Sequence, residues 1–103
     1  MSNFLDKWDK LKVEPEGKGC VEILAHYAFE MHNLEMLQCR WMGVYWICKK
    51  YLYDFDEHRC VLAEGRGDSP EEACRAMLDE LRIKVSNLQQ ELKEMEEWYE
   101  LDD

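Results

Sequence analysis

The chain has 103 residues, 47% of them hydrophobic, and its 23 acidic and 13 basic residues give a formal net charge of −10. This length fits one domain, and the apolar content is sufficient for a packed core, which excludes a wholly disordered chain. The charge excludes a general nucleic-acid binder, because such proteins depend on Lys and Arg to neutralise phosphates. A partner with a basic surface fits this charge better.

Residues 1–13 are predicted to form an amphipathic helical arm. Ser2 can cap the N-terminus of a helix, and apolar residues then recur at helical spacing. These residues are Phe4, Leu5, Trp8 and Leu11. A segment with Pro15 and two glycines follows and interrupts any regular element. Because few contacts need to cross such a segment, we expect the arm to be separate from a single domain over residues 20–103.

A second helix is predicted from Cys20 to about Cys39, because apolar residues recur there at steps of three and four. The apolar stripe consists of Val21, Leu24, Ala28, Met31 and Leu34, widened by Ile23, Tyr27 and Leu37. The polar side of this helix would carry Glu22, His26, Glu30, Asn33 and Glu35.

An antiparallel β-hairpin is predicted next, with strands over residues 41–53 and 59–64 around a polar turn at residues 54–58. Alternation places Trp46, Cys48 and Leu52 on one face of the first strand. The other face carries Tyr45, Ile47, Lys49, Tyr51 and Tyr53. Such an aromatic face could stack single-stranded bases. The negative charge of the chain counts against that role, and packing beneath a helix explains the same residues, so we expect no direct nucleic-acid binding.

The last predicted element is a long helix over residues 69–100. Ser69 is a strong N-cap with Pro70 at the first helical position, and no Gly or Pro follows. Thirty residues make roughly 45 Å of helix, which is far more than a hairpin can cover. A lone hairpin is also marginal in water and leaves its edges open, which favours a dimer or a bound partner.

This helix carries apolar residues at alternating steps of three and four over three heptads, which is typical of a coiled coil. They are Leu78, Leu81, Val85, Leu88, Leu92, Met95 and Tyr99. A parallel homodimer would place Glu91 against Glu96, whereas an antiparallel one brings Arg82 towards Glu96 and Lys84 towards Glu91. We therefore expect a homodimer, although a helix of the same chain could also cover the seam.

The C-terminal region is strongly acidic, with eleven acidic and four basic residues from Glu71 to Asp103. Such a run is usually a solvated helix face, but it can also occupy a groove built for nucleic acid. Trp98 would supply an aromatic anchor for a protein partner. The predicted partner-binding residues are Glu91, Glu94, Glu96, Glu97, Trp98 and Glu100.

No catalytic or metal-binding constellation stands out, so neither enzyme activity, a metal nor a cofactor is expected. Five widely spaced cysteines include no Cys-x-x-Cys pair, and they fit a reducing cytoplasm better than a disulfide framework. Cys60 beside His58 is the one local candidate for thiol chemistry. The chain begins without a signal peptide and contains no stretch long enough to span a bilayer, so we expect a cytoplasmic protein.

The stretch from Tyr45 to Leu81 reads as strand, turn, strand and then the helix start Asp68-Ser69-Pro70-Glu71-Glu72-Ala73-Cys74-Arg75-Ala76-Met77. It resembles small bacteriophage and prophage accessory proteins of the α-β-α sandwich type. This resemblance covers about a third of the chain, and the heptads after Leu81 depart from it. It implies a phage or mobile-element origin, and with it the cytoplasm of a host cell, but little about activity.

These observations predict an α+β fold with an N-terminal helical arm, a helix, a hairpin and a long C-terminal helix. The function hypothesis is a non-enzymatic protein-binding module, such as a phage-encoded inhibitor of a bacterial defence complex of the anti-CRISPR kind. Its acidic helix would engage a basic, nucleic-acid-binding complex. The alternative is a structural or adaptor protein that oligomerises through the heptad helix.

Overall fold

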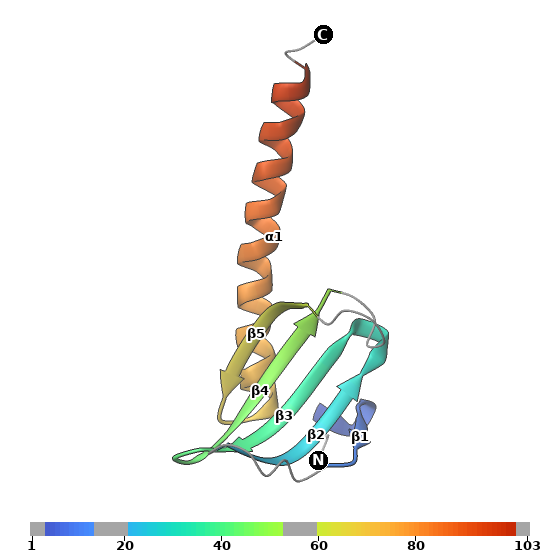
Figure 1. The fold of residues 1–103 in the computed structure, drawn as a ribbon, viewed down its shortest axis with the longest axis vertical. Coiled ribbons are helices and arrows are strands. Elements are labelled where there is room, and N and C mark those ends of the chain that lie inside the picture. The colour runs from blue at the N-terminus through green and yellow to red at the C-terminus, as the bar shows by residue number, and fades with distance from the viewer. Residues whose placement is uncertain (1–3, 14–20, 53–59, 101–103) are drawn as a thin grey trace.

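Residues 4–13, 21–52 and 60–100 are described by the computed structural model, and they form an antiparallel sheet and one long helix (Figure 1). The helix is α1 (Pro70–Glu100), and five strands follow one another across the sheet in chain order. They are β1 (Asp9–Leu11), β2 (Glu22–Phe29), β3 (Leu34–Arg40), β4 (Val44–Tyr51) and β5 (Val61–Gly67). The predicted α+β class and the long C-terminal helix are confirmed.

The helix predicted from Cys20 to Cys39 is wrong, because the described part of this segment is the hairpin of β2 and β3. The turn between them is a short 3-10 helix, η2 (Glu30–His32), followed by Asn33 with a φ of 52°. Asn is one of the few residues that adopt this left-handed conformation readily. A register shift between Ile23 and Ala25 also breaks the two-residue alternation of β2. The interrupted alternation left apolar residues at the three- and four-residue steps of a helix.

The hairpin predicted from residues 41–53 and 59–64 is confirmed as β4 and β5, while its expected turn lies outside the described residues. Alternation along β4 is also confirmed. Trp46 and Cys48 pack in the cluster beneath α1, whereas Tyr45 and Ile47 pack in a second cluster on the opposite face. Because the sheet has five strands, the expectation that a lone hairpin needs a partner for its stability no longer applies.

The N-terminal helical arm is not confirmed. Phe4–Lys7 forms a single 3-10 turn, η1, and β1 pairs antiparallel with β2 along the edge of the sheet. Leu5 is only 7% exposed and packs in the core with Met36 and Met77. These first described residues thus contribute both an edge strand and a core side chain to the sheet domain.

The beginning of α1 is fixed by the predicted N-cap Ser69 and by a second capping interaction that was not predicted. The amide of Glu72 donates a hydrogen bond to Oγ of Ser69 (3.2 Å), and the amide of Asp68 donates to the Glu72 carboxylate (2.9 Å). The first bond satisfies one of the backbone N–H groups that a helix start leaves without partners, and the second holds the residue before the N-cap against the first turn. Gly65 then lets the helix approach β5 closely, because a Cβ at this position would lie 2.1 Å from the backbone nitrogen of Met77.

The main core lies between the first turns of α1 and the centre of the sheet. Its buried members are Leu5, Met36, Cys48, Ala63, Ala73 and Met77. Small residues on β5 and α1 allow the two backbones to approach, and the methionines fill the remaining space. This packing determines the direction in which the rest of α1 leaves the sheet.

Candidate functional site: the projecting half of the C-terminal helix

The helix α1 is much longer than the sheet it covers, so its C-terminal half extends away from the domain (Figure 1). The packed half, Pro70–Lys84, includes the buried Ala73 and Met77 and ends where the Lys84 ammonium donates a hydrogen bond to the backbone oxygen of Leu62. The projecting half is residues 85–100, and every residue from 85 to 99 is exposed. Sixteen residues in a helix span roughly 24 Å.

One side of the projecting half is apolar and fully open. Its residues are Val85, Leu88, Leu92, Met95 and Tyr99, whose exposed fractions run from 42% to 72%. The same line of residues, hereafter the seam, continues into the packed half through Leu81 and Leu78. Leu81 is half-buried against the core, and Leu78 is 39% exposed. A continuous apolar line of this kind on a monomer surface marks an interaction site.

The structure places the seven predicted seam residues along one side of a continuous helix. At 3.6 residues per turn, the seam is turned roughly 70° from the side of α1 that faces β5. The sheet reaches only as far as Lys84, which contacts Leu62 near the beginning of β5, so it does not cover the seam beyond Leu81. The predicted coiled coil and homodimer stay predictions, whereas the exposure of the seam is a property of the fold.

The surface of the seam is hollowed near its C-terminal end. Leu92, Met95, Glu96 and Tyr99 line a shallow, mostly apolar depression. These residues are spaced i, i+3, i+4 and i+7. Four residues with this spacing form the hole into which a side chain of a facing helix inserts in a coiled coil. The depression therefore has the composition of a helix-packing site.

The predicted acidic binding residues lie around the same part of α1. Glu91, Glu94, Glu96 and Glu97 are exposed, and Trp98 is 67% exposed. Glu100 ends the helix, and its side chain lies outside the described residues. Lys93 is the sole basic residue among residues 85–100 of the sequence. By helical spacing, Glu91 and Glu96 flank the seam, whereas Glu94 and Glu97 lie on the other side of the helix.

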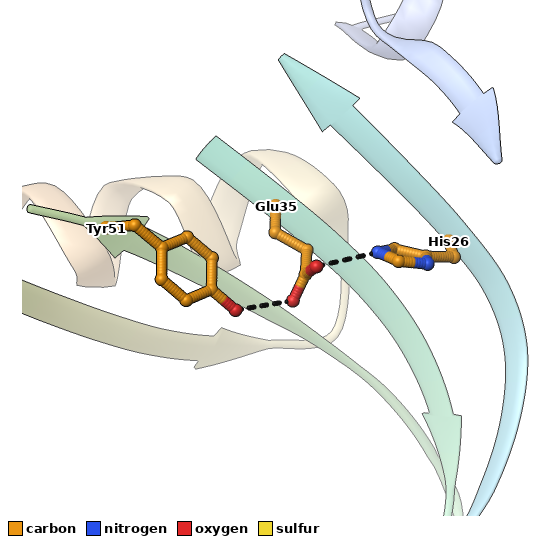
Figure 2. Close-up of polar contacts among 3 residues, drawn as sticks. All are labelled: His26, Glu35 and Tyr51. Carbon is orange, nitrogen blue, oxygen red and sulfur yellow. Dashed lines mark hydrogen bonds and ion pairs between the residues drawn. The ribbon is translucent and has the colours of Figure 1, made fainter. Parts of the chain in front are cut away.

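A polar cluster that the sequence did not predict lies on the face of the sheet away from α1 (Figure 2). Glu35 on β3 accepts a hydrogen bond from the Tyr51 hydroxyl on β4 (2.7 Å) and contacts Nε2 of His26 on β2 (2.8 Å). Glu35 is 5% exposed and Tyr51 is equally buried. The cluster therefore connects three adjacent strands through one buried carboxylate.

The environment of Glu35 favours its charged form. Burial raises the pKa of this carboxyl, but the hydrogen bonds from His26 and Tyr51 and the charges of His26 and Lys49 outweigh it, so the pKa lies below its ordinary value. Both carboxylate oxygens are occupied by neighbours, as Figure 2 shows. The cluster therefore has the character of a structural network. The cluster was not predicted from the sequence, because His26 and Glu35 were assigned to the polar side of a helix.

The aromatic face predicted on β4 is not an open stacking platform. Tyr51 is buried in the Glu35 cluster, and the Arg66 guanidinium lies over the Tyr45 ring at 5.5 Å from its centroid. Tyr53 lies outside the described residues. Base stacking requires exposed rings, so the described part of this face offers little for it.

The cysteines of the described part are free thiols, and two of them meet beneath α1. Cys48 on β4 and Cys74 on α1 share a hydrogen bond, which together with burial raises the pKa of the Cys48 thiol. The same hydrogen bond lowers the pKa of the Cys74 thiol to about 7. Cys60 is exposed, but its predicted partner His58 lies outside the described residues. No group of three metal-ligating side chains occurs in the part of the chain that the structure describes.

Comparisons of the chain with protein-family models, with curated proteins and with solved structures found no match. None of the helices in the described ranges is both long enough and apolar enough to cross a membrane. The projecting half of α1 is therefore the candidate site on physical grounds alone, because it combines exposed apolar side chains, a depression with helix-packing spacing and a concentrated charge.

Proposed function

We propose that this protein is a protein-binding module that acts through the projecting half of α1, with the sheet domain as its rigid base. The observation that carries this proposal is the open seam. Five large apolar side chains from Val85 to Tyr99 line one side of a helix that no described element covers. Removing such side chains from water is the main driving force of helix association.

Two further features support a role in assembly. The sheet holds the first half of α1 through core contacts at Ala73 and Met77, so the direction of the projecting half is fixed by the fold. A helix of sixteen residues is marginal in water unless its apolar side is packed. A partner helix would supply that packing, so binding and stability of this segment are coupled.

The experiment is a co-purification with wild-type protein, Leu88→Lys and Gln90→Lys, from a bacterial lysate that also contains a differently tagged copy of the chain. Both substitutions replace a neutral residue with Lys, so the two variants add the same charge. They differ in position, because Leu88 lies in the seam and Gln90 lies on the opposite side of the same turns. We expect Leu88→Lys to lose its bound protein and Gln90→Lys to keep it. Equal retention by both variants would contradict a seam that binds protein.

A second candidate function is the inhibition of a bacterial defence complex of the anti-CRISPR kind, with the acidic helix occupying a basic groove. The charge of the projecting half supports it, since five acidic residues face one lysine over residues 85–100. Binding of this kind depends on long-range attraction and weakens as salt screens the charges.

The two candidate functions can be distinguished by variants on the side of the helix that faces away from the seam. Glu94 and Glu97 lie away from the seam, so the variant Glu94→Lys/Glu97→Lys removes charge without touching apolar contacts. An inhibitor of the acidic type should lose its target with this variant and at high salt, whereas assembly through the seam should survive both changes. The measurement is the same co-purification, carried out at low and high salt.

A further inference from the structure

We propose that the projecting half pairs with the projecting half of a second copy of this chain, as an antiparallel two-helix coiled coil whose twofold axis passes between Leu88 and Leu92, at the level of Gln90. This inference rests on the proposed function and names its partner. Three independent features of the described residues lead to it: the extent of the open seam, the depression near its end and the placement of charge beside it.

The extent of the seam selects the register. With the axis at the level of Gln90, each residue faces the residue of the second copy that lies equally far on the other side of position 90. The seam then forms three kinds of layer. Leu88 faces Leu92 of the second copy, Val85 faces Met95, and Leu81 faces Tyr99. These six residues are all of the seam except Leu78, and one of them, Leu81, lies in the last turns of the packed half. Each is used once in each chain.

The sheet domain favours this register over the next one. A shift by one heptad towards the N-terminus would place Met95 of the second copy beside Leu78, and the end of its helix beside the first turns of the packed half. Tyr99 of the second copy would then face Cys74, which is already packed against the core of the sheet domain. The register centred on Gln90 leaves both sheet domains at opposite ends of the helix pair.

The depression provides an acceptor for one of these layers. In an antiparallel pair, the Val85 side chain inserts into the space between Met95, the residue it faces, and the neighbours of Met95 on the second helix. For Met95 these neighbours are Leu92, Glu96 and Tyr99, which line the depression together with Met95 itself. A β-branched side chain of this size matches a shallow apolar hole.

The charges beside the seam decide between the two orientations. In the antiparallel pair, Arg82 approaches Glu96 of the second copy, and symmetry makes this contact twice. Both side chains are exposed, and Arg82 now forms an ion pair with Asp79 at 3.0 Å, on the surface of its own helix. A parallel pair would instead place Glu91 against Glu96 twice. The antiparallel pair has one repulsive contact, between the two Glu91 carboxylates at the axis, against two attractive ones. Attraction therefore exceeds repulsion in the antiparallel orientation and not in the parallel one.

The test is a charge-exchange series measured by analytical ultracentrifugation, with Arg82→Glu, Glu96→Arg, the double variant, and Glu94→Arg as the control. The control carries the same change in charge as Glu96→Arg, but on the outer side of the helix. We expect wild-type protein to be a dimer, and we expect Arg82→Glu and Glu96→Arg each to weaken the dimer on the order of tenfold. The double variant should restore the affinity, and the control should not weaken it.

Three results would overturn the inference. A monomeric wild-type protein excludes the second copy as partner, yet leaves the proposed function standing if Leu88→Lys still loses a different bound protein. A tighter dimer with Glu96→Arg indicates the parallel orientation, because that change replaces a repulsive contact with Glu91 by an attractive one. A double variant as weak as the single variants rules out the contact between residues 82 and 96. Circular dichroism of every variant shows whether the helix is intact.

Discussion

The two halves of α1 are built from the same kind of sequence and have opposite surroundings. Met77 in the packed half is 1% exposed, whereas Met95 in the projecting half is 60% exposed. Both belong to apolar lines with helical spacing, and the helix passes from one environment to the other without a break. The difference arises from β5, where Gly65 and Gly67 let the first turns of the helix approach and where the first residues of the strand, at Leu62, lie level with Lys84.

This comparison shows that periodicity identifies the apolar side of a helix but not what covers it. In the packed half the cover is the sheet of the same chain, and the contribution of each side chain appears in the stability of the fold. In the projecting half no described element covers the side chains, and under the proposed function their contribution appears in association. The following predictions test that division.

The largest expected effect comes from shortening one methionine in each half. Met77→Ala should lower the free energy of unfolding by about 3 kcal/mol, because it leaves a cavity in the core between β5 and α1. Met95→Ala should leave the unfolding of the sheet domain nearly unchanged and weaken dimerisation instead. Urea unfolding followed by Trp fluorescence, at a concentration where the protein is monomeric, measures the first effect. A comparable loss in both variants would show that the two halves are not separate in this way.

The second prediction uses pH, which acts on the sheet domain through the buried carboxylate of Glu35. The pKa of Glu35 is held below its ordinary value in the folded state, so its contribution to stability is present above that value and is lost as pH falls through the folded pKa. The sheet domain should therefore weaken in acid.

The variant Glu35→Gln isolates the sheet part of this response. We expect it to lose about 2 kcal/mol at neutral pH, because Tyr51 and His26 then face an amide in place of a charged acceptor. The difference from wild-type protein should shrink on acidification. Urea unfolding at neutral pH and at about pH 4 measures both values. An unchanged difference at the two pH values would mean that the carboxylate charge contributes nothing.

The sequence predicted the elements whose signals are local. Ser69 and Pro70 marked the start of α1, the absence of later Gly and Pro gave its length, and alternation gave the two faces of β4. It failed for β2 and β3, because the register shift near Ile23 disturbs alternation and because both faces of β2 are partly covered. Asn33 was the one residue in that segment with a turn signal, and it was assigned to a helix surface.

The features of the candidate site were likewise predictable only in part from the sequence. The seam was predictable because heptad spacing can be recognised in the sequence alone. Its exposure was not, because exposure depends on where the sheet ends. The Glu35 cluster was not predictable, because it joins three strands whose pairing follows from the register of the whole sheet. Contacts between residues distant in sequence cannot be read from spacing when one of the elements is assigned incorrectly.

The smallest expected effect concerns the edge of β5, where the packed half protects a strand that has no further neighbour in the described sheet. The Glu80 carboxylate accepts a hydrogen bond from the backbone amide of Glu64 (3.1 Å) and contacts Lys84 at 3.3 Å. An edge amide held by a side chain exchanges its hydrogen more slowly than one that faces water. Glu80→Ala should therefore accelerate hydrogen exchange at Glu64 several-fold.

The matched control for this change is Glu94→Ala in the projecting half. Glu94 contacts only the neighbouring turn, through a hydrogen bond from Gln90 at 3.2 Å, so its loss should leave exchange along β5 unchanged. Site-resolved exchange by NMR measures both variants under identical conditions. Faster exchange at Glu64 in both would show that the projecting half also stabilises the sheet, and the division of α1 at Lys84 would then be wrong. Faster exchange in Glu80→Ala alone would place the boundary between fold and interaction surface at the last turn that contacts β5.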